Sequence, residues 1–283
     1  MLRMVKAELY KLFKSGTFKV LIIISLVSII QCIYHILLEK NVTFVSEGGV
    51  IEVPFKEDDR IVIPGQLGVI KTDAEDVDDI KSYETFNISF GIGVIEILIA
   101  ILVGRSVAKE YSEGTIKNTL AYGQKRSHFY LSKYVANIIV ISILIGIITI
   151  GSTVALTIIK GWGKPFEISQ LMKMINTFIG AMIIYGGVLA VFMLIAILIK
   201  NNGGTIVIAI LGFVLFPTQI AFSYGQNVVF DKIYESTLFY NSLLVTHIKA
   251  TNVDIIKASW TGMIWLIVSL LLGIKIFERQ KIK

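Results

Sequence analysis

Residues 134–159 read YVANIIVISILIGIITIGSTVALTII, an apolar run without a single charged residue. A helix needs about 20 such residues to cross a bilayer. Five further stretches have the same character, so the sequence predicts an all-α integral membrane protein with six transmembrane helices. The other five predicted spans are 17–38, 88–108, 175–199, 205–222 and 259–277.

The overall composition agrees with this class of protein. The chain has 283 residues, of which 54% are hydrophobic and only 17% are charged. This composition excludes a disordered chain and almost any soluble globular protein. The single cysteine, Cys32, cannot form an internal disulfide, and no Cys/His cluster has the spacing of a zinc site. We therefore expect no metal and no cofactor.

Basic residues gather on one side of the predicted spans. The N-terminal segment, the loop after the second span, the turn at Lys200 and the C-terminal tail carry sixteen basic residues against four acidic ones. The other side carries eleven basic and sixteen acidic residues. An excess of Lys and Arg favours the cytoplasmic side. We predict cytoplasmic N- and C-termini, a multi-pass protein of a bacterial plasma membrane, and no nucleic-acid partner.

Residues 1–16 are amphipathic at helical spacing. They predict a helix that lies in the membrane interface, in contact with lipid, before the first span. The alternative is that this segment continues the first span into the cytosol. The expected apolar face consists of Leu2, Val5, Leu9, Leu12 and Phe13.

Residues 39–87 predict a sizeable extracellular loop between the first two spans. The loop is acidic, with twelve Asp and Glu against five Lys and Arg, and short β-prone runs within it could form strands. Its run DAEDVDD does not fit the EF-hand pattern, which requires a glycine at position 6 and a glutamate at position 12. A solvated acidic loop is therefore favoured over a calcium site.

Motifs of common enzymes are missing from the sequence. It contains no P-loop, no H-E-x-x-H and no G-x-S-x-G, so we do not expect an enzyme. Glu96 lies deep in a predicted span, where an ionisable residue is costly and is a functional candidate by default. The alternative is a protonated carboxyl that bonds to Ser, Thr or Asn on a neighbouring helix.

Residues 109–133 predict a compact, charged protrusion on the cytoplasmic side. Gly114 interrupts the first helical run, and Thr115 can cap a second one that Gly123 ends. Such a protrusion suits the docking of another protein, although an ordinary positive-inside loop has a similar composition.

This segment, from Glu110 onward, reads EYSEGTIKNTLAYGQKRSHFYLSK. It resembles the first cytoplasmic loop of ABC-2 type transporter permeases, and among them the bacterial bacitracin/lantibiotic-immunity-like group. In that group E-x-x-x-G-T-x-K is followed by G-x-x-R and by an aromatic-Leu-x-K tail. The matching residues are Glu110, Gly114, Thr115, Lys117, Gly123, Arg126, Tyr130 and Lys133.

The resemblance implies a permease that pairs with a second permease chain, identical or homologous, and contacts a separate ATP-binding cassette subunit on which ATP is hydrolysed. It implies export or clearance of a peptide antibiotic, a lipid or a similar amphiphile, and hence antibiotic resistance or lantibiotic immunity. The alternative is a non-transporting sensor or assembly module that docks a cytoplasmic partner. The implied ATPase-coupling residues are Glu110, Glu113, Gly114, Thr115, Lys117, Arg126, Tyr130 and Lys133.

Overall fold

The described part of the chain is almost wholly helical. A computed structural model describes residues 1–38, 81–91, 93–117, 124–163, 165–215, 227–248 and 250–280. These residues contain no strand, which confirms the all-α prediction for them. The strands expected within the 39–87 loop and the helix end expected at Gly123 lie outside the described residues.

Four helices are long and apolar enough to cross a membrane. They match the predicted spans 17–38, 134–159, 175–199 and 259–277. Three of them begin seven or eight residues earlier than the apolar runs do, because helical hydrogen bonding continues into the polar flanks. The four are α2 (Gly16–Leu38), α7 (Arg126–Lys160), α8 (Ile168–Ile199) and α13 (Asn252–Arg279).

The predicted span 88–108 is interrupted. Gly91 and Gly93 have positive φ angles of 46° and 85° and separate two helical pieces. Glycine adopts this left-handed backbone without the strain that a side chain would bring. The pieces are α3 (Thr85–Ile88) and α4 (Val94–Val103), which continues as a π-helix, η2 (Gly104–Ala108), and as α5 (Lys109–Ser112).

The predicted span 205–222 also contains a shorter helix. It starts as α9 (Asn202–Ile210) and continues as the π-helix η3 (Leu211–Leu215), after which residues 216–226 lie outside the described part. The sharp turn expected before it is confirmed. Lys200 is left-handed with φ 57°, and Asn201 caps α9 by accepting a hydrogen bond from the N–H of Gly204.

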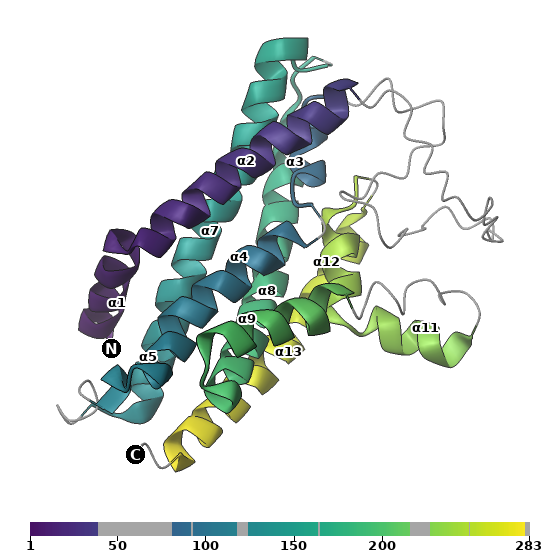
Figure 1. The fold of residues 1–283 in the computed structure, drawn as a ribbon. Coiled ribbons are helices and arrows are strands. Elements are labelled where there is room, and N and C mark those ends of the chain that lie inside the picture. Colours follow the sequence, from purple (N-terminus) through teal and green to yellow (C-terminus); the bar gives the residue numbers. More distant parts are fainter. Residues whose placement is uncertain are drawn as a thin grey trace, which may run out of the picture.

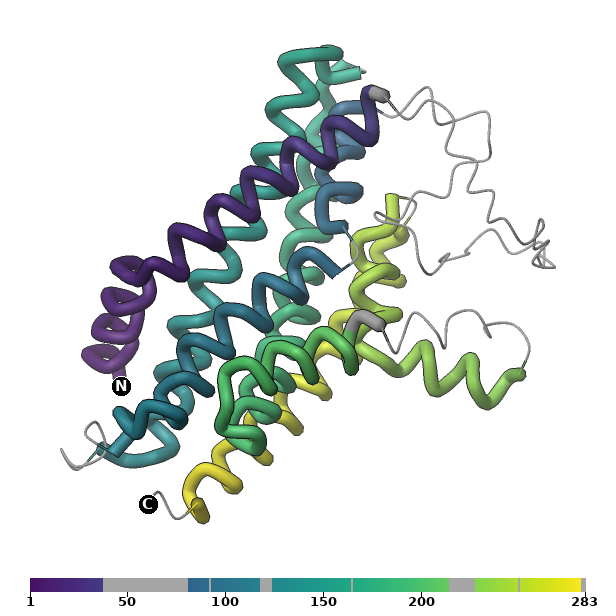
Figure 2. Tube along the Cα trace, viewed as in Figure 1, coloured from purple at the N-terminus to yellow at the C-terminus, as the bar shows by residue number. Residues whose placement is uncertain are grey.

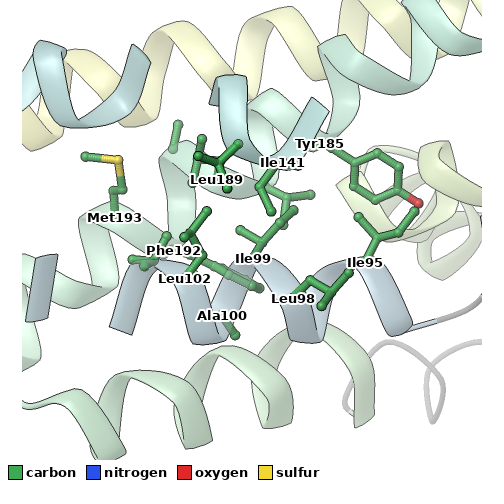
Figure 3. Close-up of a cluster of buried hydrophobic side chains, with 14 of the residues drawn as sticks. Ile95, Leu98, Ile99, Ala100, Leu102, Ile141, Tyr185, Leu189, Phe192 and Met193 are labelled. Atoms are coloured by element: carbon green, nitrogen blue, oxygen red, sulfur yellow. The ribbon is translucent and has the colours of Figure 1, made fainter. Parts of the chain in front are cut away.

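Helix α8 lies at the centre of the bundle, and the core forms where α4 and α7 pack on it. Figure 3 shows apolar side chains from all three helices meeting in this core. The same helix packs closely along α13 through glycines, since Gly187 lies against Gly262. Close approach at small residues is the usual way in which membrane helices associate. The labelled core residues include Ile95, Leu98, Ile99, Ile141, Leu189 and Phe192.

Two short helices, α11 (Val228–Glu235) and α12 (Leu238–Thr246), precede α13. Helix α12 is mostly buried and packs against α8 and α13. Helix α11 extends away from the bundle (Figure 1). Its residues Val228, Val229, Phe230 and Ile233 are exposed, whereas Tyr234 is buried.

The N-terminus and the C-terminal end of α13 lie at the same end of the molecule, near α5 (Figure 1). There α1 (Leu2–Lys14) turns from α2 at Ser15 and packs against α7 (Figure 2). A helix is present within residues 1–16, as predicted, and the side that it buries against the bundle overlaps only partly with the apolar face expected to contact lipid. Its buried residues are Val5, Glu8 and Leu12, whereas Leu2 and Phe13 are exposed.

Candidate functional site

Lys133 is the centre of a buried charged site at the end of the bundle that holds the termini. Its side chain on α7 is only 2% exposed. The ammonium group donates hydrogen bonds to Glu8 Oε2 at 2.8 Å and to the backbone oxygen of Ser106 at 2.9 Å. Glu110 Oε2 lies 2.9 Å from the same nitrogen as an ion-pair partner. A buried lysine is thus paired with carboxylates from α1 and α5.

Lys11 completes this site. Its ammonium lies 3.0 Å from Glu8 Oε1 and 3.7 Å from Glu110 Oε1. Two lysines and two glutamates therefore alternate around a closed four-charge ring, which consists of Glu8, Lys11, Glu110 and Lys133. The ring has no formal net charge, which is what burial in a medium of low dielectric requires.

The ring shifts the pKa values of its α1 members. Burial would raise the pKa of Glu8, but the charge and hydrogen bond of Lys133, together with the hydrogen bond of Lys11, hold it below its ordinary value. For Lys11, burial would lower the pKa, but the hydrogen bond and charge of Glu8 and the charge of Glu110 hold it above its ordinary value. Both shifts favour the charged forms of these groups.

This electrostatic arrangement predicts that the folded chain loses stability in acid. Because the folded pKa of Glu8 lies below the ordinary value of 4.5, its contribution is complete above 4.5 and is lost as pH falls through the folded pKa. We expect the difference in unfolding temperature between the wild type and Glu8→Gln, measured in detergent by circular dichroism, to shrink over that range. A difference that stays constant in acid would contradict the prediction.

The π-helix η2 supplies the backbone oxygen in this site. The N–H of Lys109 bonds to the oxygen of Gly104, five residues back, instead of four as in an α-helix. Ser106 lies within this segment. Its hydroxyl donates to Asn137 Oδ1 at 2.9 Å, and the Asn137 amide donates to the oxygen of Lys133 at 2.8 Å. Two polar side chains thereby fix η2 against α7 beside the ring.

Arg126 fixes the end of α13 in the same region. Its guanidinium donates to the backbone oxygens of Glu278 at 2.9 Å and Gln280 at 2.6 Å. A cation at a helix C-terminus satisfies carbonyls that lack helical partners. The Tyr111 hydroxyl donates to Gln280 Oε1 at 2.8 Å, and Gln280 Nε2 donates to the oxygen of Ile197 at 2.8 Å. These contacts join α5, α7, α8 and α13.

Tyr130 packs in the interior next to this contact. Its ring lies against Phe277, with the centroids 6.1 Å apart, and its hydroxyl occupies the space beside Gly273. Tyr130 and Arg126 thus hold α13 against the start of α7.

The other four predicted coupling residues, Glu113, Gly114, Thr115 and Lys117, lie at or beside an exposed turn. Gly114 has φ 69°, so it turns the chain as predicted. Glu113 pairs with Lys109 at 3.1 Å, and the Thr115 hydroxyl donates to the oxygen of Glu110 at 3.4 Å. The side chain of Lys117 is exposed. The turn surface, defined as Glu113, Thr115 and Lys117, is therefore accessible and is connected directly to Glu110.

The eight residues predicted to couple to an ATPase therefore divide into two groups. Glu110, Arg126, Tyr130 and Lys133 hold helices together, whereas the others form or shape the turn surface. Glu8 and Lys11 are not among the residues that the motif predicts. A signal for Glu8 exists in the sequence, because this acidic residue falls at helical spacing between the buried Val5 and Leu12.

Glu96 lies far along α4 from the ring and is not part of it. It occupies the first turn of α4 after the Gly93 cap and is 2% exposed. It lines a small cavity with residues of α3, α8 and α12. The structure therefore places Glu96 in a different site from the four-charge ring.

Comparison with known proteins identifies one family. A family model described as "ABC-2 family transporter protein" matches residues 60–216, more than half of the chain. The matched range includes Glu96, Glu110 and Lys133, whereas Glu8 and Lys11 precede it. No curated protein and no solved structure matches the chain.

Proposed function

The chain belongs to the ABC-2 family of transporter proteins, and from this premise we propose how it works as the permease subunit of an ABC transporter. In this proposal a separate subunit binds and hydrolyses ATP. When that subunit changes conformation, it displaces the turn surface. The four-charge ring transmits this displacement to the helices of the bundle.

The observation that carries this proposal is the continuity from the exposed turn to the buried ring. Glu110 accepts the hydrogen bond of Thr115 through its backbone and pairs with Lys133 through its carboxylate. Lys133 belongs to a helix of 35 residues that is long enough to cross the membrane. A displacement of the turn would therefore pull on both α1 and α7.

We also propose a topology of six spans with both termini in the cytoplasm of a bacterial cell. Four spans are the long helices, and the other two would be formed by the α3–α4 segment and by the α9 segment with its continuation. The positions of the termini at one end of the bundle and the excess of basic residues on that side support this topology.

The proposed partners are the ATP-binding cassette subunit, membrane lipid and a second permease chain. Exposed apolar side chains along α2 suit contact with lipid or with that second chain, and α2 is the least buried of the long helices. They include Val20, Ile23, Val27 and Ile30.

The proposed substrate is an amphiphile such as a peptide antibiotic or a lipid. The support is the family resemblance of the 110–133 loop together with the acidic composition of residues 39–87, which would attract a cationic peptide on the outer side. Loss of the gene should then increase sensitivity of the cell to such a compound.

Lys117→Glu is the variant that tests the coupling proposal. Because Lys117 is exposed, we expect reversal of its charge to leave the unfolding temperature unchanged but to reduce recovery of the ATP-binding subunit in affinity purification at least tenfold. Resistance of the cell to the substrate should fall with it. The control is Lys14→Glu, on the exposed side of α1, which should retain the partner.

Two outcomes would contradict the coupling proposal. In the first, no ATP-binding subunit co-purifies with the wild type. In the second, Lys117→Glu retains both partner and resistance. Recovery of a different cytoplasmic protein, with resistance unaffected by loss of the gene, would instead support the sensor or assembly module.

A further inference from the structure

A small polar cavity lies beside Glu96, where the helix is broken between α3 and α4. The cavity is small and has room for about one water-sized particle. Broken helices at membrane depth are tolerated where the free backbone lines a cavity, and transporters use such breaks to bind ions. The polar residues of the lining are Asn87, Glu96, Tyr185, Ser242 and Thr246.

The carboxylate of Glu96 is only partly compensated. The carboxyl group lies in the first turn of α4, but its Oε2 is buried and has no hydrogen-bond partner among the described residues. A helix N-terminus supplies only about half a positive charge. An ionised carboxylate in this position would therefore keep an unbalanced negative charge, which is costly in the interior.

Two other polar side chains of the lining offer acceptor oxygens. The Ser242 hydroxyl donates to the oxygen of Phe239 at 2.7 Å, and the Thr246 hydroxyl donates to the oxygen of Ser242 at 2.8 Å. Because each hydroxyl hydrogen is already donated to a backbone oxygen, the two hydroxyl oxygens can act only as hydrogen-bond acceptors or cation ligands toward a particle in the cavity.

Among the described residues that line the cavity, none has a basic side chain. The titratable groups of these residues are Glu96 from α4 and Tyr185 from α8, while α3 and α12 contribute neutral residues. Asn87 of α3 directs its amide nitrogen to the oxygen of His247, at 3.3 Å. An acidic group with two acceptor oxygens in the same cavity favours a ligand that carries positive charge.

We propose that this cavity binds one small monovalent cation on Oε2 of Glu96. The shared chemistry is a single positive charge, carried either by a proton on the carboxyl group or by an alkali ion of sodium size. Binding joins the α3–α4 break to α8 and α12, so occupancy stabilises the packing of α12. The inference does not depend on the ATP-binding partner.

The test measures the purified full chain in detergent while pH and the salt cation, sodium or choline, are varied. Two readouts are followed: the unfolding temperature, and the infrared carbonyl stretch of protonated carboxyl groups. We expect the wild type to unfold at a higher temperature when the site is occupied and Glu96→Gln to lose this response. Glu113→Gln removes an exposed carboxyl group and should retain the response.

The two cations give different results. A proton is the ligand if the carbonyl band and the unfolding temperature follow pH alike in sodium and in choline. Sodium is the ligand if it removes the band at constant pH and raises the unfolding temperature, while choline does neither. The proposal is overturned if the wild type and Glu96→Gln respond alike, or if the band persists at all pH values in both salts.

Thr246→Val keeps the test decisive if Glu96→Gln does not fold. This variant retains the carboxyl group and removes one acceptor oxygen from the cavity. We expect the cation concentration at half-maximal stabilisation to rise at least threefold. An unchanged midpoint would place the ligand elsewhere and overturn the proposal.

Discussion

Lys133→Met is expected to lower the free energy of unfolding by about 3–5 kcal/mol, since removal of one partner leaves buried charges uncompensated. Lys133 is 2% exposed and lies between Glu8 and Glu110, whose side chains are also largely shielded. The measurement is reversible denaturation of the purified chain in mixed micelles. The proposed transport activity should be lost when the chain unfolds.

Lys11→Met is the matched control for this variant. Lys11 contacts the same two glutamates, but its side chain is 54% exposed. Exposed ion pairs contribute about 0–1 kcal/mol, so its removal should have a small effect. Adding Glu8→Gln and Glu110→Gln to Lys133→Met should recover much of the loss, because no buried charge then remains. Equal stabilities of Lys133→Met and Lys11→Met would refute the role assigned to the ring.

Gly262→Ala is expected to give the second large loss, about 1–3 kcal/mol, because it overpacks the contact between α8 and α13. A Cβ atom at Gly262 would lie 3.1 Å from the Cα of Ile184 and 3.2 Å from its backbone nitrogen. Backbone atoms in a helix cannot move aside as a flexible side chain can. The two helices would have to separate, which the same denaturation assay detects.

Gly146→Ala is the control for this substitution. Gly146 lies within α7, and a Cβ atom there would have no neighbour within 4 Å. Alanine is favoured over glycine in a helix by about 1 kcal/mol, so this variant should be at least as stable as the wild type. Similar losses for the two alanine variants would mean that steric contact at Gly262 is not the cause.

Sequence patterns predicted the long helices well, because the length of an apolar run is a local property. The run at 134–159 lies within α7, and the turn at Lys200 follows from the glycine and asparagine residues beside it. The interruption of the 88–108 span was not predicted. Its signal is the pair Gly91 and Gly93, but isolated glycines are also common in uninterrupted membrane helices.

The candidate site could be predicted only in part. The loop motif identified Glu110 and Lys133, but not that they lie together in the interior. The contact of Lys133 with Glu8 joins residues 125 positions apart, and no local pattern specifies such a pairing. The apolar face expected for residues 1–16 left Glu8 out because hydrophobicity alone assigns a charged residue to solvent. Here a buried lysine from another helix makes its burial favourable.

The π-helix η2 accommodates one residue more than a regular α-helical turn, since the N–H of Lys109 bonds to the oxygen five residues back. Deletion of one residue from this segment, with Ser106 retained, would therefore restore regular α-helical bonding and leave Glu110 in nearly the same rotational position. An insertion of one residue in the regular helix α4 has the opposite effect: an α-helix advances by about 100° per residue, so Glu110 would turn away from Lys133. Natural variation in length should therefore be tolerated within η2 more readily than within α4.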